Sequence, residues 1–122
     1  MKLGIIPNTS KKNIEEVVEL IVDKFEKNDF QCSFSQDFKL LLGENSIFKN
    51  HCFQNKKELF TKNDLIVSIG GDGTLLTSSY DGRKYGTPML GINFGKLGFL
   101  AEYEINDLDL LIEELNQPHL NR

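Results

Sequence analysis

The chain has 122 residues, enough for one domain with a hydrophobic core and too few for two complete domains. Hydrophobic residues make up 39% and charged residues 26%, a balance that argues against wholesale disorder or a fibrous design. The formal net charge of −4 disfavours a general nucleic-acid binder. No apolar run approaches the ~18 residues of a membrane span, so we expect neither nucleic acid nor membrane as a partner.

Two cysteines, Cys32 and Cys52, lack Cys-x-x-Cys spacing and have no histidine at zinc spacing. We expect free, reduced thiols and assign no metal ligand. Pro7 interrupts the only apolar start, which argues against a signal peptide. A cytoplasmic location is expected.

The first predicted elements form a strand-helix-strand unit. Apolar residues indicate a strand over 2–6 that ends at Pro7-Asn8. A helix should begin at Asn13, which with Glu16 resembles a capping box, and should stop at Asn28-Asp29. The apolar residues of this helix recur at helical spacing: Ile14, Val17, Val18, Ile21, Val22 and Phe25.

The middle of the chain is harder to interpret. Alternating apolar and polar residues indicate a strand over 30–35 near a sheet edge. Between 36 and 62 the apolar residues have no clear period, so only a short helix around 55–60 is predicted there. The run over 65–69 is short, rich in β-branched residues and almost wholly apolar, which predicts a mid-sheet strand covered on both faces.

The last third continues the alternation of strands and helices. A short helix should begin at Thr74 and end at an Asp81-Gly82 turn, followed by a parallel strand over 87–93. A final helix capped by Asn106 has an apolar stripe: Leu108, Leu111, Ile112 and Leu115. The order predicts one three-layer α/β domain over 1–122, with a mainly parallel sheet, right-handed crossovers and helices on both faces.

Three glycines surround one carboxylate between the central strand and the next helix. Gly70, Gly71 and Gly73 leave backbone N–H groups open to an anion, and a helix start at Thr74 adds the positive end of its dipole. A carboxylate beside a phosphate is repelled unless a metal ion lies between them or it takes a proton from the attacking hydroxyl. Asp72 therefore indicates phosphoryl transfer. The alternative is a non-catalytic nucleotide-binding module in which Asp72 only shapes a turn.

Two motifs carry a resemblance to known kinases. The first, Gly70-Gly71-Asp72-Gly73-Thr74, resembles the signature shared by NAD kinases, diacylglycerol and sphingosine lipid kinases and, more loosely, phosphofructokinases. The second, Gly91-Ile92-Asn93-Phe94-Gly95-Lys96-Leu97-Gly98-Phe99-Leu100, resembles the companion motif of NAD kinases, whereas lipid kinases carry an Asn-Asp pair there. The chain thus resembles the Rossmann-like N-terminal domain of an NAD kinase, with a lipid kinase domain as the alternative.

The resemblance implies a reaction. The γ-phosphoryl group of ATP, or of inorganic polyphosphate in some members, would pass to the 2′-hydroxyl of the adenosine ribose of NAD, giving NADP. A divalent cation, Mg²⁺ by expectation, would neutralise the phosphates. In this family a β-rich second domain follows and the cleft lies between the two, so we expect 1–122 to be inactive alone. The full-length protein is expected to be a homo-oligomer.

The resemblance also assigns residues, several of which have an ordinary structural role as the alternative. Asp72 would be the base, with Gly71 and Gly73 lining the dinucleotide or phosphate site. The other assigned residues are Thr74 (phosphate ligand or helix cap), Leu76 (dinucleotide wall or core), Asn93 (ligand hydroxyl or its own loop), Lys96 (phosphate or solvent) and Phe99 (adenine stacking or core).

Overall fold

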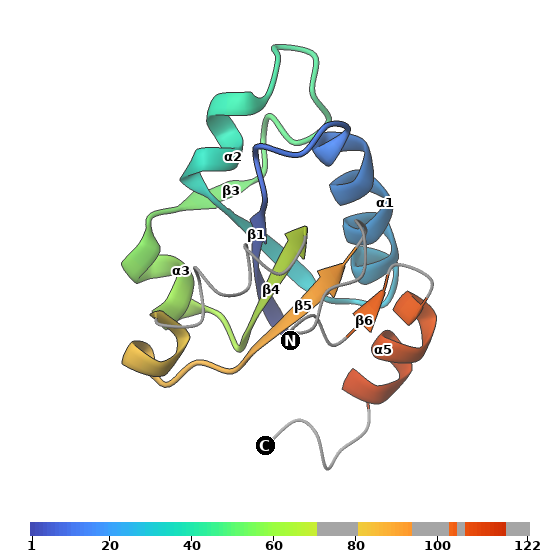
Figure 1. The fold of residues 1–122 in the computed structure, drawn as a ribbon, viewed down its shortest axis with the longest axis vertical. Helices are drawn as coiled ribbons and strands as arrows, with labels where there is room; N and C mark the ends of the chain where they lie inside the picture. The colour runs from blue at the N-terminus through green and yellow to red at the C-terminus, as the bar shows by residue number, and fades with distance from the viewer. Residues whose placement is uncertain (71–80, 94–102, 105–106, 117–122) are drawn as a thin grey trace.

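The computed structural model describes residues 1–70, 81–93, 103–104 and 107–116. Within these residues, six strands form one sheet in the order β3-β2-β1-β4-β5-β6 (Figure 1). They are β1 Lys2–Pro7, β2 Gln31–Ser35, β3 Cys52–Gln54, β4 Leu65–Gly70, β5 Met89–Asn93 and β6 Tyr103–Glu104. Every neighbouring pair runs parallel, which confirms the predicted sheet.

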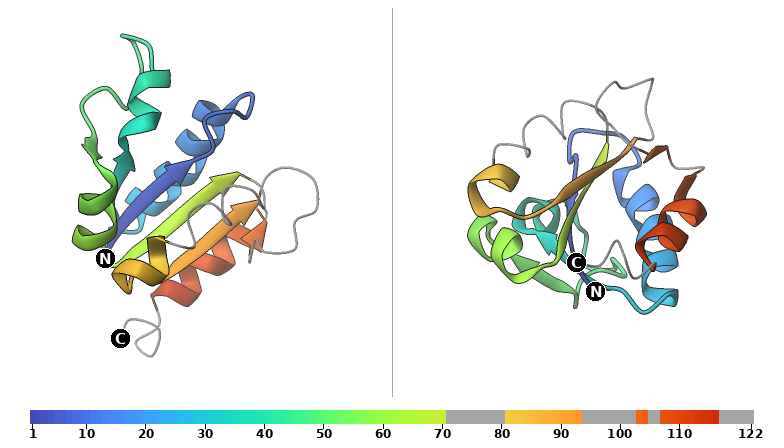
Figure 2. Two further views of the ribbon diagram at one scale, coloured as in Figure 1. Left: turned by 60° about the vertical axis from the view of Figure 1, so that its left-hand side comes forward. Right: turned by 90° about the horizontal axis from the view of Figure 1, so that it is seen from below.

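The helices cover both faces of the sheet. They are α1 Ile14–Lys27, α2 Gln36–Leu41, α3 Lys56–Lys62 and α5 Leu108–Leu115, and residues 81–85 are also helical. Helices α1 and α5 lie on one face, whereas α3 and residues 81–85 lie on the other (Figure 2). The three-layer prediction is therefore confirmed. No helix in the described ranges is both long and apolar enough to cross a membrane.

The larger part of the core lies between the sheet and α1 with α5. Alternate strand residues face these helices: Leu3, Ile5, Leu65, Val67, Ile69, Leu90 and Ile92. The predicted stripes of both helices belong to the same cluster, except that Val17 is only partly buried. Lys24 Nζ lies 2.7 Å from Asp109 Oδ1 and so links α1 to α5.

A smaller cluster lies between the sheet and α3. Leu59, Phe60 and Ile66 form its buried centre. A Cβ added to Gly4 of β1 would lie 2.7 Å from Ile66 Cδ1 and 3.1 Å from Leu59 Cδ1. The missing side chain at Gly4 therefore lets α3 pack close to the sheet.

The segment over 36–62, left largely without a prediction, contains α2, β3 and α3. Phe38 and Phe48 are almost fully buried and pack on Phe34 of β2, with ring centroids 5.3 and 5.1 Å apart. The predicted short helix is confirmed as α3, whose N-cap Asn55 forms a capping box with Glu58. The outermost strand, β3, was missed because three residues are too few to show a period.

Two helix starts differ from prediction. Asn13 does precede α1, but its φ of 60° is left-handed and its side chain makes no capping hydrogen bond, so the predicted capping box is wrong. At the last helix the N-cap is Asp107 and not Asn106, which lies outside the described residues. The Asn-x-x-Glu pattern does form a capping box at Asn55, whose backbone is extended as is typical of an N-cap.

The predicted turn at Asp81-Gly82 is also wrong, because both residues are helical. A Cβ at Gly82 would lie 2.4 Å from Met89 Sδ, so this glycine permits close packing on β5. The helical turn ends four residues later, at Gly86, whose φ of 69° is the left-handed conformation that favours glycine.

Replacing Gly86 should destabilise the fold. Gly86→Ala is expected to lower the free energy of unfolding by ~1–2 kcal/mol, because a Cβ is disfavoured in the left-handed region. Gly43→Ala is the matched control: its φ is not positive and nothing lies within 4 Å of its ideal Cβ. That variant should be neutral or stabilised by up to ~1 kcal/mol. Urea unfolding measures both, and equal effects would contradict the assignment.

Candidate functional site

The carboxyl ends of three neighbouring strands meet at one edge of the sheet. Pro7 at the end of β1 pairs with Ile69 of β4, and Gly70 pairs with Asn93 at the end of β5. The backbone N–H of Asn8 donates to the carbonyl of Ile69 over 2.8 Å, which extends the contact beyond β1. The segments that leave β4 and β5 therefore start side by side.

This edge is a topological switch point. From β1 the chain continues to β2 on one side, whereas from β4 it continues to β5 on the other side. In open α/β sheets, ligands bind outside the carboxyl ends of the strands at the point where the connections diverge. The glycine-rich segment follows β4 and therefore begins at the position where this fold places ligands.

Two polar residues are buried within these strands. Asn93 is 4% exposed at the end of β5, as predicted for its position beside the glycine-rich segment. Ser68 of β4 is 1% exposed and pairs with Ile6 on one side and Gly91 on the other. Ser68 was not among the predicted site residues, because one serine inside an apolar strand carries no signal of its own.

The remaining predicted site residues lie outside the described residues: Gly71, Asp72, Gly73, Thr74, Leu76, Lys96 and Phe99. The described backbone reaches Gly70 and Asn93, from which their segments depart, and continues from Asp81 and Tyr103. Asn93 is thus the predicted site residue that the structure places, and the functional roles of all of them stay predictions.

The titratable groups with shifted pKa values have structural causes. Burial, and secondarily the charge of Glu26, raises the pKa of the Cys32 thiol to about 12, so this thiol stays protonated and is no nucleophile. The backbone N–H of Asn55, followed by the Lys62 ammonium, lowers the pKa of Glu58. That carboxylate stabilises α3 above its unfolded-state pKa and loses this effect as pH falls through the folded value.

Metal-ligating side chains do not gather in the part of the chain that the structure describes. There, no three His, Cys, Asp or Glu residues lie close enough to hold an ion.

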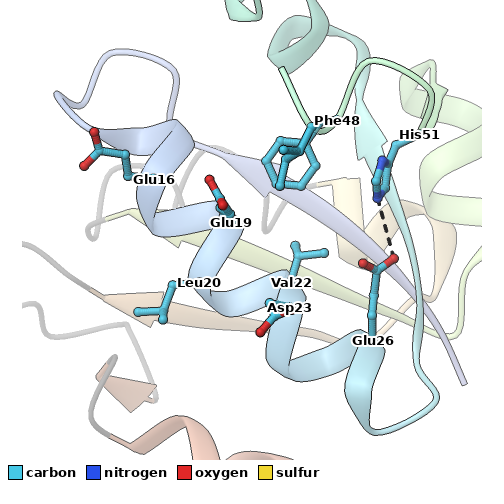
Figure 3. A pocket seen from close by; sticks show the side chains of 9 residues that line it. Glu16, Glu19, Leu20, Val22, Asp23, Glu26, Phe48 and His51 are labelled. Atoms are coloured by element: carbon cyan, nitrogen blue, oxygen red, sulfur yellow. Dashed lines mark ion pairs between the residues drawn. The ribbon is translucent and has the colours of Figure 1, made fainter. Parts of the chain in front are cut away.

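A pocket of about 470 Å³ lies away from the strand ends, between α1 and residues 47–51 (Figure 3). Four carboxylates line it: Glu16, Glu19, Asp23 and Glu26. His51 Nε2 lies 3.6 Å from Glu26 Oε2, an ion pair when the imidazole is protonated. The negative charge of this pocket disfavours phosphates, so we do not assign the nucleotide to it.

Comparison with known proteins identifies the family. The model of the ATP-NAD kinase N-terminal domain matches residues 3–120. The chain belongs to this family. Its membership confirms the resemblance carried by the two glycine-rich motifs.

Curated relatives of this ATP-NAD kinase domain share about a third of its residues. It is 34% identical over 117 residues to the NAD kinase of Acetivibrio thermocellus, an alignment that covers 94% of this chain. It is 31% identical over 115 residues to the NAD kinase of Flavobacterium johnsoniae, covering 93% of this chain. These alignments span only 38% and 39% of the relatives, respectively.

A solved structure supports the fold independently. The crystal structure of yeast NADH kinase complexed with NADH superposes with a TM-score of 0.69 at 17% sequence identity. The match covers 94% of this chain and 37% of that chain. The likeness shows that the ATP-NAD kinase domain has the same α/β fold as the corresponding part of that enzyme.

The two thiols should differ in reactivity. Cys52 is exposed, whereas Cys32 is buried, and at pH 8 a pKa of about 12 leaves only roughly one Cys32 in 10⁴ as thiolate. Iodoacetamide should therefore modify Cys52 in the folded protein and Cys32 only in urea, as measured by mass spectrometry of peptides. Cys52→Ser should take up no label while folded. Equal labelling of both thiols in the native state would contradict the burial of Cys32.

Proposed function

We propose that the whole protein to which this domain belongs transfers the γ-phosphoryl group of ATP, or of polyphosphate, to the 2′-hydroxyl of the adenosine ribose of NAD. The observation that carries the proposal is the pairing of Gly70 with Asn93 at the switch point of the sheet. This pairing makes the two glycine-rich segments start side by side. The segment after β4 then supplies a phosphate site, and the segment after β5 can contact the acceptor.

The roles proposed for the site residues follow from the chemistry of this transfer. Asp72 takes the proton of the attacking hydroxyl, while Gly71, Gly73 and Thr74 present backbone and hydroxyl donors to phosphate oxygens. Lys96 supplies a positive charge for a phosphate. Asn93 hydrogen-bonds a ligand hydroxyl, and Leu76 and Phe99 provide apolar contact, Phe99 by stacking on adenine.

The proposal extends to the rest of the system. A divalent cation, Mg²⁺ in this proposal, accompanies the donor phosphates and reduces their repulsion of the incoming hydroxyl. Residues 1–122 act as one nucleotide-binding domain, and the further length seen in the relatives supplies the opposite wall of the cleft. The protein works in the cytoplasm as a homo-oligomer.

The test of the base uses a chain extended to the full length of its relatives. Asp72→Asn should lower turnover at least ~100-fold, because asparagine keeps the size of the side chain and loses its basicity. Asp29→Asn is the matched control: Asp29 lies in the turn after α1 with a φ of 68°, which asparagine also adopts. Turnover is followed as NADP formation. Activity of Asp72→Asn within a few fold of wild type would remove Asp72 from the base role.

The acceptor class separates this proposal from the lipid kinase alternative. Incubation of the full-length chain with labelled ATP and either NAD or diacylglycerol shows which acceptor is phosphorylated. We expect label in NADP alone. Label in the lipid would favour the alternative, and label in neither would favour a non-catalytic nucleotide-binding module.

Stacking by Phe99 on adenine can be distinguished from a core role by comparing ligand affinity with stability. Phe99→Ala should weaken dinucleotide binding by ~1 kcal/mol with little loss of stability, whereas truncating a core phenylalanine lowers the free energy of unfolding by ~3–5 kcal/mol. Phe48→Ala is the core comparison, because Phe48 is 1% exposed. Thermal unfolding of the full-length chain with and without NAD distinguishes the two cases. A loss of stability at Phe99 as large as at Phe48 would place Phe99 in the core.

A further inference from the structure

A second pocket, of about 340 Å³, lies at the carboxyl edge of the sheet, on the side of β4 where β1, β2 and β3 lie. Its wall contains the ends of β1, β2 and β3, represented by Pro7, Ser35 and Gln54, and Asp81 also lines it. Asn93 and β5 lie on the opposite side of β4 in the strand order. Because phosphoryl transfer joins two substrates at one phosphate, a binding place on each side of the end of β4 suits the proposed reaction.

The pocket combines an apolar surface with polar groups that can bind a ligand. Ile6, Leu59 and Phe60 contribute apolar area. Within the described residues, the Ser35 side chain makes no capping hydrogen bond to α2, so its hydroxyl can bind a ligand. Gln54 Oε1 accepts a hydrogen bond of 2.9 Å from Asn63 Nδ2, which leaves the Gln54 NH₂ group to donate. Apolar surface with a few fixed polar groups is typical of small-molecule sites.

The described charged residues of the pocket disfavour a phosphate in its interior. Among the described residues that line it, Asp37 and Asp81 contribute two carboxylates and Lys56 contributes the one cation. Lys56 Nζ already lies 3.4 Å from Asp81 Oδ2. A phosphate inside would meet uncompensated negative charge, whereas a neutral ribose or base could donate hydrogen bonds to Asp37.

The volume of the pocket limits the size of the ligand that it can hold. A volume of about 340 Å³ lies at the lower end of the ~300–1,000 Å³ range of small-molecule pockets. It suits a single nucleoside, and a complete dinucleotide would need more space. A nucleoside here would direct its phosphates toward the end of β4, where the glycine-rich segment begins.

We propose that this pocket binds the nucleoside part of a nucleotide, with the base on the surface of Ile6, Leu59 and Phe60 and with hydroxyl or amino groups bound by Ser35, Gln54 and Asp37. The inference rests on the proposed function in one respect, because the nucleotide is taken to be one of its substrates. Adenosine is common to the proposed donor and acceptor, so the pocket chemistry fits either source.

Titration of the full-length chain, labelled with ¹⁵N, tests the proposal by NMR, with adenosine, ATP, NAD and inorganic triphosphate as separate probes. Adenosine and at least one of the two nucleotides should shift the backbone amides of residues 35–37 and 54–56, and triphosphate alone should not. ATP shifts that persist at saturating NAD would identify the donor nucleoside. NAD shifts at these amides that ATP displaces would identify the adenosine of the acceptor.

A variant pair makes the test specific. Ser35→Val combined with Asp37→Asn removes a hydroxyl and a charge from the pocket and should raise the dissociation constant of the bound nucleotide about fivefold or more. Ser33→Val is the control, because Ser33 lies in the same strand with similar burial and does not line the pocket. It should bind as the wild type does.

Two results would overturn the proposal: adenosine that leaves the pocket amides unshifted, or triphosphate that shifts them as strongly as ATP. Both results would be measured on the wild-type chain, so neither depends on whether a variant folds. The kinase assay with Asp72→Asn reports on the reaction separately. Nucleoside binding without NAD phosphorylation would contradict the proposed function alone, and phosphorylation without nucleoside binding in this pocket would contradict the pocket alone.

Discussion

The burial of β4 on both faces is the constraint on which the rest of the structure depends. All six of its residues are buried, and it pairs with β1 on one side and β5 on the other. A strand in this position cannot slip by one residue without exchanging the sets that face the two helical layers. Its register therefore fixes where Gly70 ends the strand. It also brings Gly70 beside Asn93 before any ligand is considered.

The two faces of the sheet differ in how much apolar side-chain bulk they carry. The face under α1 and α5 carries a continuous set of large apolar residues along β1, β4 and β5. On the other face the row at Ile66 lies between Gly4 and Met89, whereas the row nearer the carboxyl edge has Ser68 between Ile6 and Gly91. Apolar bulk thus decreases toward the carboxyl edge, which is where open α/β sheets bind ligands. Stability comes chiefly from the layer that lies away from the proposed chemistry.

Much of this fold could be predicted from local patterns, because long elements repeat their signal. The stripe from Ile14 to Phe25 and the unbroken run of β4 are examples, since each is dictated by burial alone. The failures arose where tertiary contacts decide. Gly82 has the sequence of a turn, yet its missing side chain serves packing against Met89. Strand β3 depends on parallel pairing with β2 and has no pattern of its own.

The candidate site divides in the same way. Asn93 could be placed from sequence, because a strand that ends in a polar residue before a glycine-rich loop has a recognisable pattern. The residues of the second pocket could not, since Ser35, Gln54 and Asp81 come from separate elements and resemble ordinary surface residues in the sequence. The parallel order β3-β2 brings Ser35 and Gln54 to one edge, and the helical residues before β5 bring Asp81 there.

The charge at this edge has a consequence for how a nucleotide is oriented. Carboxylates on the β1 side repel phosphates, whereas the open N–H groups expected of the segment after β4 attract them. The difference in electrostatic potential between the carboxylates and these N–H groups does not depend on any single hydrogen bond. It would orient a nucleotide before all of its contacts form. Lys56 modulates this difference: while paired with Asp81 it cancels one carboxylate, and its side chain is 67% exposed, so it can turn toward a phosphate at little cost. The charges at the switch point would thus determine that the phosphates of the nucleotide lie toward the segment after β4. The two sides of the switch point differ in charge rather than in shape.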